Sequence, residues 1–248
     1  MTLTPLQALA TDKFVQTTAT GGLGTLTDTD IDAFELEASR RILLNLRELL
    51  FGQPMLDLIR DQVDASTRRY QDAVAASGGE YQVGQIILGV KGISAKELFP
   101  WIAANIGAAM AAGDDDERKR TLSSSFVFPM HPEHYAMAPG GVGVIETMGG
   151  APTLTYVGHF PDGAMPEFVA ELIDPSYEFV NAGRGVLSVG GEQSYVLQQF
   201  KDTTDGLEAN LRIWYPTASP ASAIEEHLKH YAVEFRNAIR MAAAQLKS

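Results

Sequence analysis

The sequence predicts an α+β protein, with a helical N-terminal region over residues 1–120 and an antiparallel sheet plus a long C-terminal helix over residues 121–248. Three observations predict this class. Apolar residues recur at intervals of three and four in the first region, which is typical of amphipathic helices. From Thr121 onward, short β-rich runs alternate with turns that contain Gly and Pro. In the last residues, apolar positions again have helical spacing. Helices followed by a meander of strands and then one more helix is an order of elements typical of α+β proteins.

The N-terminal region begins with a polar, Thr- and Gly-rich stretch over residues 1–26, which we expect to be an extended arm. Apolar spacing then predicts a helix over residues 30–51, and Gly52 can end it. A second helix is expected over residues 54–78 because apolar residues continue at the same spacing.

A third helix is predicted to begin after Ser94, since Ser94 and Glu97 have the spacing of a capping box. The charged run DDDERKR that follows is interpreted as a solvated loop.

Within the predicted sheet, Asp205-Gly206 predicts a hairpin turn between two strands. The predicted strands are the runs SSFVFPMH, VGVIETM, TLTYVGHF, FVAELI, RGVLSV, SYVLQQFK and LEANLRIWY.

Composition excludes several classes of function. The net charge is −12, and the basic residues do not cluster, so we expect no nucleic-acid partner. The chain has no cysteine, so a metal ion would have to be bound by His, Asp or Glu. Neither a signal peptide nor an apolar run long enough for a membrane helix is recognised, and we expect a cytoplasmic protein. The sequence does not determine the oligomeric state, and a homo-oligomer is possible.

The final helix is predicted to begin at Ser219, with Pro220 in its first turn. On a wheel of about 100° per residue, one arc is charged, and the opposite half is apolar. His230 and Glu234 lie on that buried half, four residues apart. They could bind one metal ion together or hydrogen-bond to each other. The charged arc consists of Glu225, Lys229, Arg236, Arg240 and Lys247.

A second group of candidate ligands lies in the segment MHPEHY, where the sheet is expected to begin. If this segment is a strand, His131, Glu133 and Tyr135 share one face and His134 lies on the other. Should His131 and Glu133 meet the helical pair, two histidines and two carboxylates would form a site suited to Zn²⁺ with room for a water. The alternative is a strand end with its polar residues in water. Glu146 alternates with apolar neighbours and is interpreted as a solvent-facing strand position.

Four motifs resemble a known family. GVKGISAKELFPWI, HPEHY, VLQQFKDTTDGLEANLRIWYP and HYAVEFRNAI occur in an order similar to that of the 2,4-diacetylphloroglucinol hydrolases, which include phloretin hydrolases. The resemblance covers roughly residues 85–245. It implies a helix-grip (Bet v 1-like) sheet around the C-terminal helix and a Zn²⁺ ion that serves to cleave the carbon–carbon bond between an acyl group and a phenolic ring.

The resemblance also implies roles for individual residues. His230 and Glu234 match the family's helical ligand pair, and Glu133 matches its glutamate at the start of the sheet. The family's remaining histidine lies in a helix that resembles ELFPWIAANIG, where this chain has no histidine and Asn105 is the nearest polar candidate. His131 is therefore expected as the fourth ligand, with His134 as the other choice.

The resulting expectation is a zinc-dependent hydrolase of an acylated phenol or a related β-dicarbonyl compound. Tyr135 or Tyr231 would position the phenol. The first alternative is a non-catalytic helix-grip protein that binds a hydrophobic or aromatic small molecule. The second is a metal-free enzyme, such as a polyketide cyclase, in which His230 and Glu234 act together as a general base. In each case the expected partner is a small phenolic or polyketide-like molecule.

Overall fold

The computed structural model describes residues 17–21, 24–111, 113–140, 143–161 and 164–247. The chain divides into two units, Met1–Glu48 and Leu49–Ser248. In the first unit, strands β1 (Thr18–Gly21) and β2 (Gly24–Thr27) form an antiparallel hairpin that leads into helix α2 (Asp28–Leu49). The predicted helix over residues 30–51 is thus confirmed. Of the expected arm, residues 1–16 and 22–23 lie outside the described residues.

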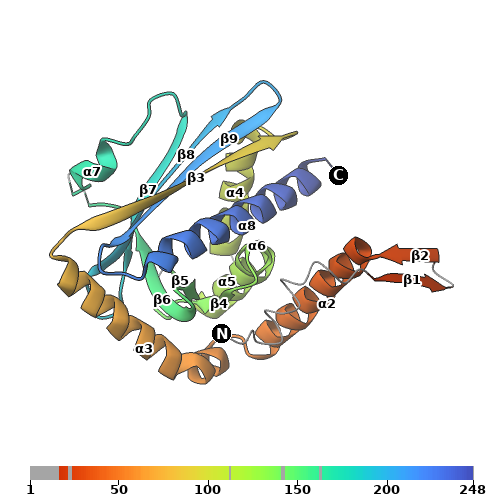
Figure 1. Ribbon diagram of the computed structural model, residues 1–248, viewed down its shortest axis with the longest axis horizontal. Coiled ribbons are helices and arrows are strands. Elements are labelled where there is room, and N and C mark those ends of the chain that lie inside the picture. The colour runs from red at the N-terminus through yellow and green to blue at the C-terminus, as the bar shows by residue number, and fades with distance from the viewer. Residues whose placement is uncertain (1–16, 22–23, 112, 141–142, 162–163, 248) are drawn as a thin grey trace. The chain divides into compact units, whose positions relative to one another are not determined.

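The second unit is built on an antiparallel sheet of seven strands in the order β3-β9-β8-β7-β6-β5-β4 (Figure 1). This sheet and the long last helix confirm the α+β class. The strands are β3 (Tyr81–Lys91), β4 (His134–Met137), β5 (Gly143–Met148), β6 (Ala151–Gly158), β7 (Phe179–Val186), β8 (Glu192–Asp202) and β9 (Gly206–Pro216). The helices are α3 (Gln53–Ser77), α4 (Ala95–Met110), α5 (Asp115–Leu122), α6 (Phe128–Met130), α7 (Glu167–Ala170) and α8 (Ala221–Leu246), with a π-helical turn, η1 (Ser123–Val127).

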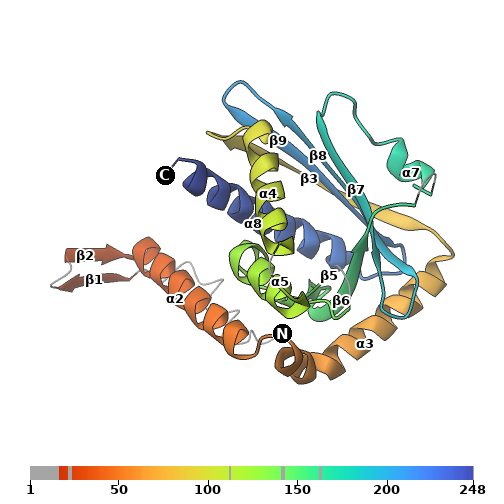
Figure 2. The ribbon, with the colours of Figure 1, turned by 180° about the vertical axis from the view of Figure 1, so that it is seen from behind.

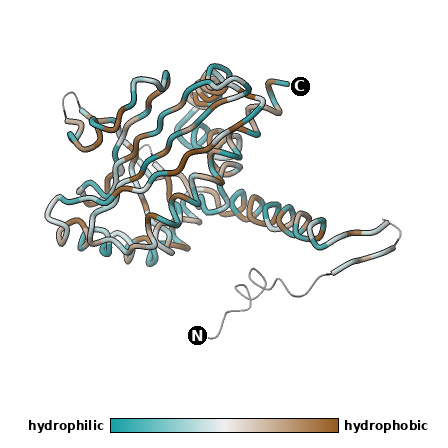
Figure 3. Tube along the Cα trace, turned by 45° about the horizontal axis from the view of Figure 1, so that its top comes forward, coloured by the Kyte–Doolittle hydropathy of each residue, from teal (hydrophilic) through white to brown (hydrophobic). Residues whose placement is uncertain are grey.

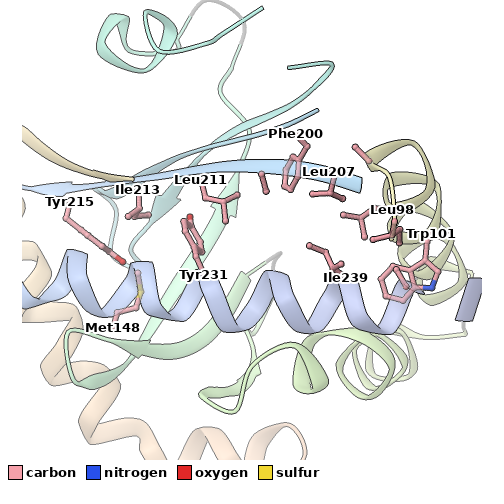
Figure 4. Packing of buried hydrophobic residues seen from close by; sticks show 14 of the residues in the cluster. Leu98, Trp101, Met148, Phe200, Leu207, Leu211, Ile213, Tyr215, Tyr231 and Ile239 are labelled. Atoms are coloured by element: carbon pink, nitrogen blue, oxygen red, sulfur yellow. The ribbon is translucent and has the colours of Figure 1, made fainter. Parts of the chain in front are cut away.

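Helix α8 packs on one face of the sheet. It contacts β3 and β9 at one end of the strand order and β5 near the other end (Figures 1 and 2). The main apolar core lies between α8 and the sheet and includes Leu211, Ile213 and Tyr231 (Figure 4). Each large apolar side chain buried in such a core contributes about 1.5–3 kcal/mol. Gly84 on β3 permits the close approach of the helix, because a Cβ there would lie 2.3 Å from Ile224 Cγ2.

Helix α3 packs against strands β4 to β6. Its Ile59 and Val63 belong to a second apolar cluster with Ile145 of β5 and Leu154 of β6. Strand β5 therefore has two buried faces, one toward α3 and one toward α8. Because side chains alternate along a strand, Glu146 points away from the face that carries Ile145.

One strand comes from the region that was expected to be helical. Strand β3 pairs with β9 in register from Tyr81↔Pro216 to Lys91↔Gly206. The sheet thus includes a segment that precedes residue 121. The spacing of apolar residues in this segment could not predict the pairing, because the partner strand lies far away in the sequence.

The run SSFVFPMH, predicted as a strand, is helical instead and forms η1 and α6. The hydroxyl groups of Ser124 and Ser125 donate to the carbonyl oxygens of Arg120 and Thr121, one turn earlier, so the polar start of the run continues a helix. The preceding charged run is also not a loop but helix α5, whose N-cap is Asp114. The prediction of a strand at FVAELI is likewise wrong, because this run contains the short helix α7.

Helix ends were predicted with mixed success. The Ser94–Glu97 capping box is confirmed at the start of α4. Ser219 does not cap α8, whose N-cap is Pro220 without a side-chain hydrogen bond. Hydrophobic and hydrophilic stretches alternate over short distances along the chain (Figure 3), and none of the described helices is both long and apolar enough to cross a membrane.

Candidate metal centre

Three buried histidines from separate segments meet beside α8. His131 follows the short helix α6, His134 is the first residue of β4, and His230 lies in α8. One ring nitrogen of each lies within 4.8 Å of those of the other two. Three imidazoles at this separation can hold a metal ion.

A carboxylate completes a tight triangle with two of these histidines. His134 Nε2 lies 3.2 Å from His230 Nε2, and Glu146 Oε2 lies 3.3 Å and 3.1 Å from these two nitrogens. In a tetrahedral zinc site with bonds of about 2.0–2.1 Å, neighbouring ligand atoms are about 3.3 Å apart. The three side chains therefore fit one face of a tetrahedron around a zinc-sized ion.

Glu234 is the next closest carboxylate. Its oxygens lie 3.9 Å from His134 Nε2 and from His230 Nε2, and its side chain is 21% exposed. The prediction that His230 and Glu234 lie on the buried half of the helix is confirmed for His230, and Glu234 is partly buried. Glu234 can therefore supply a fourth ligand atom next to these two histidines.

Hydrogen bonds orient two of the imidazoles differently. His134 Nδ1 lies 2.7 Å from the carbonyl oxygen of Val127, to which it donates. Its Nε2 therefore carries the lone pair that a metal needs, and such a bond is typical of metal ligands. His131 Nδ1 instead accepts the backbone N–H of Glu133 at 3.0 Å, so this nitrogen is already engaged. The His131 ring stacks on His230, with ring centroids 3.6 Å apart.

The electrostatics of the group favour a cation. Burial opposes ionisation of Glu146, but the imidazoles of His134 and His230 outweigh it and hold its pKa well below the usual range. Burial also opposes protonation of His230, yet Glu146 beside it raises the pKa of this imidazole. Burial raises the pKa of the Glu234 carboxyl. A buried carboxylate without a metal thus depends on its histidine neighbours for compensation.

The other predicted site residues lie outside the histidine group. Glu133 is exposed, and its side chain is outside the histidine group. The Tyr135 hydroxyl lies 3.3 Å from Thr147 Oγ1, whereas Tyr231 is buried in the core beside the site. Asn105 donates to the Trp101 carbonyl of its own helix.

Two interpretations of the sequence at this site were wrong. Residues 131–133 lie before β4 and not in a strand, so the alternation rule does not separate His131 from His134. Glu146 does not face solvent, because it is buried against the histidines. The burial of Glu146 could have been inferred from its position two residues from both Val144 and Met148. These apolar side chains lie on the same face of β5 as Glu146 and line the same cavity.

A cavity of about 160 Å³ lies between α8 and the sheet, next to this group. Its wall includes Glu146 and Glu234, and also His227 and Tyr231 of α8. On another side, His131 and His230 line a surface hollow of about 370 Å³. The candidate metal ligands thus border both a cavity and the surface.

Comparison of the chain with known protein families and with curated proteins finds no match in either.

Proposed function

We propose that this protein is a zinc-dependent hydrolase that cleaves the carbon–carbon bond between an acyl group and a phenolic ring, or the equivalent bond of a β-dicarbonyl compound. The observation that carries the proposal is the triangle of His134, His230 and Glu146 at the wall of the cavity. The four motifs that resemble 2,4-diacetylphloroglucinol hydrolases support the same activity. The contacts of α8 with strands near both ends of the sheet order also agree with a helix-grip fold.

The donor set suits zinc better than harder cations. Imidazole nitrogen is a preferred ligand of Zn²⁺, whereas Mg²⁺ and Ca²⁺ prefer oxygen ligands. His134, His230 and Glu146 would supply three protein ligands, and Glu234 would be the fourth or would share its position with water. His131 lies within the group but would have to release the Glu133 N–H to bind through Nδ1.

A zinc ion bound here would lower the pKa of a water ligand toward neutrality and would polarise the acyl carbonyl. The overall reaction adds one water: the oxygen ends on the acyl carbon as a carboxylic acid, and a proton ends on the ring carbon. When the carbon–carbon bond breaks, its electron pair passes into the ring, which leaves as an enolate. The cavity wall must therefore supply a hydrogen-bond donor for the enolate oxygen.

Elemental analysis of protein purified without an affinity tag tests the metal. We expect about one zinc per chain, and we expect zinc-dependent release of a carboxylic acid from phloretin or 2,4-diacetylphloroglucinol. Chelation should abolish this release, and added Zn²⁺ should restore it. Protein that holds no stoichiometric metal, and that gains no cleavage from added Zn²⁺, would overturn the proposal.

The second candidate is a helix-grip protein that binds a hydrophobic or aromatic molecule without cleaving it. It is favoured by Met148, a deformable side chain that lines the cavity. It is also favoured by Asn105, the nearest polar candidate for the missing histidine, whose side chain donates a hydrogen bond to the Trp101 carbonyl of its own helix. A thermal-shift screen with phenolic ketones, followed by product analysis of the same mixtures, separates binding from cleavage. A metal-free polyketide cyclase has less support, because His230 Nε2 and Glu234 Oε2 are 3.9 Å apart, too far for a hydrogen bond.

A further inference from the structure

A second polar pair lies beside the metal-binding group. Tyr215 of β9 is fully buried, and its hydroxyl oxygen lies 3.1 Å from His227 Nδ1 of α8. Figure 4 shows the Tyr215 side chain reaching from the strand toward the helix. His227 is also buried, and its ring stacks nearly parallel to that of His230, with centroids 5.3 Å apart.

The hydrogen bond selects one tautomer of His227. The Tyr215 hydroxyl has no other hydrogen-bond partner among the described residues. If it only accepted a proton from Nδ1, its own proton would be buried without an acceptor, which is costly. The hydroxyl therefore donates to Nδ1, and the ring proton of His227 is on Nε2.

The protonated Nε2 remains for a ligand. His227 lines the cavity together with Glu146 and Glu234, and its Nε2 makes no hydrogen bond within the part of the chain that the structure describes. The structure thus brings an oriented N–H donor to the cavity wall, next to a residue that would hold the metal.

We propose that His227 donates a hydrogen bond from Nε2 to the ring oxygen of the substrate and stabilises the enolate that forms as the acyl group departs. This inference rests on the proposed hydrolase. The bond that breaks leaves its electron pair on the ring, negative charge appears on that oxygen, and the N–H of His227 meets it there. Tyr215 acts through His227 and is a positioning residue.

Two substitutions of His227 separate its two nitrogens. In His227→Asn, the amide can still reach Tyr215 but has no donor at the Nε2 position, whereas His227→Gln keeps an N–H near that position. With phloretin as substrate, we expect kcat to fall about 100-fold or more in His227→Asn, as for the loss of one donor to a developing oxyanion. His227→Gln should retain more activity than His227→Asn. Tyr215→Phe should lower kcat less, with KM nearly unchanged, and zinc content should stay at the wild-type level in all three.

A binding measurement keeps this inference distinct from the proposed function. Calorimetry with 1,3,5-trihydroxybenzene, a phenol without an acyl group, should show binding about tenfold weaker in zinc-loaded His227→Asn than in the wild type, the loss expected for one hydrogen bond. Equal affinities and equal rates for the wild type and His227→Asn would overturn the role of His227, and so would equal losses in His227→Asn and His227→Gln. Wild-type protein that binds the phenol through His227 but cleaves no acylated phenol would overturn the hydrolase alone.

Discussion

Glu146 Oε2 on strand β5 lies 3.1 Å from His230 Nε2 on helix α8. The same carboxylate oxygen lies 3.3 Å from His134 Nε2, so a strand of the sheet and the last helix meet at one buried group. A buried carboxylate is costly unless a partner compensates its charge. In the protein without metal the imidazoles provide this compensation, and a bound cation would provide it more completely.

Replacement of Glu146 should therefore weaken metal binding. Glu146→Gln keeps the shape of the side chain but removes its charge, and we expect the affinity for Zn²⁺ to fall by more than tenfold, since even loss of an outer partner costs about 10–100-fold. Competition with a chromogenic chelator measures this affinity. Glu208→Gln is the matched control, because Glu208 pairs with Lys201 and Tyr177 away from the group. Equal zinc affinity in both variants would contradict the assignment of Glu146.

Glu234→Gln tests the fourth position. Its oxygens lie 3.9 Å from two histidine nitrogens, so we expect a loss of zinc affinity of at least about tenfold, with folding nearly intact. Glu225→Gln should change neither property, because Glu225 is 71% exposed and pairs with Lys229 on the solvent face. Surface changes of this kind usually stay within about ±0.5 kcal/mol. A Glu234→Gln protein with wild-type metal affinity and hydrolysis would remove Glu234 from the site.

The helical half of the site could be predicted from the sequence. A helix has a fixed angular period, so the charged arc of α8 marks its solvent-facing side and thereby predicts which side of the helix is buried. His230 is indeed buried, whereas Glu225 and Lys229 of the charged arc are exposed. The capping box at Ser94 was predictable for the same reason, since all of its contacts are local.

The strand half of the site could not be predicted in the same way. A strand buried on both faces has no polar side to serve as a reference, and β5 lies between α3 and α8. Glu146 therefore had the alternating pattern of a solvent-facing residue while lying in the interior. Strand β3 presented a similar difficulty, since it forms by pairing with a distant strand, β9. Local polarity does not report which elements come together in space.

His134 should matter more for metal binding than His131. Because His134 Nδ1 donates to Val127, the Nε2 of His134 carries a lone pair for an ion, whereas His131 Nδ1 accepts the Glu133 amide. We therefore expect His134→Gln to lose zinc almost completely and His131→Gln to lose only about tenfold in affinity, at the lower end of the loss for an outer partner. The zinc content after dialysis against a weak chelator measures the difference. Greater loss in His131→Gln than in His134→Gln would reverse the assignment.

The metal-free protein should lose stability in acid partly through His227. Burial lowers the pKa of this imidazole from 6.5 to about 4. Between these values the unfolded chain binds more protons than the folded chain, so stability is present above pH 6.5 and is lost as the pH falls toward 4. The raised pKa values of His230 and Glu234 act in the opposite direction. The contribution of His227 must therefore be measured as a difference between two proteins.

That difference is obtained from urea unfolding of the chelated wild type and of chelated His227→Gln, each at about pH 7.5 and about pH 5. His227→Gln removes the titrating imidazole but leaves His230 and Glu234 in place. The free energy of unfolding should fall between the two pH values by about 2 kcal/mol more in the wild type than in the variant. An equal fall in both proteins would mean that His227 titrates in the folded chain as it does in the unfolded one. His227 would then be open to solvent and could not be the oriented, uncharged donor that the cavity wall requires.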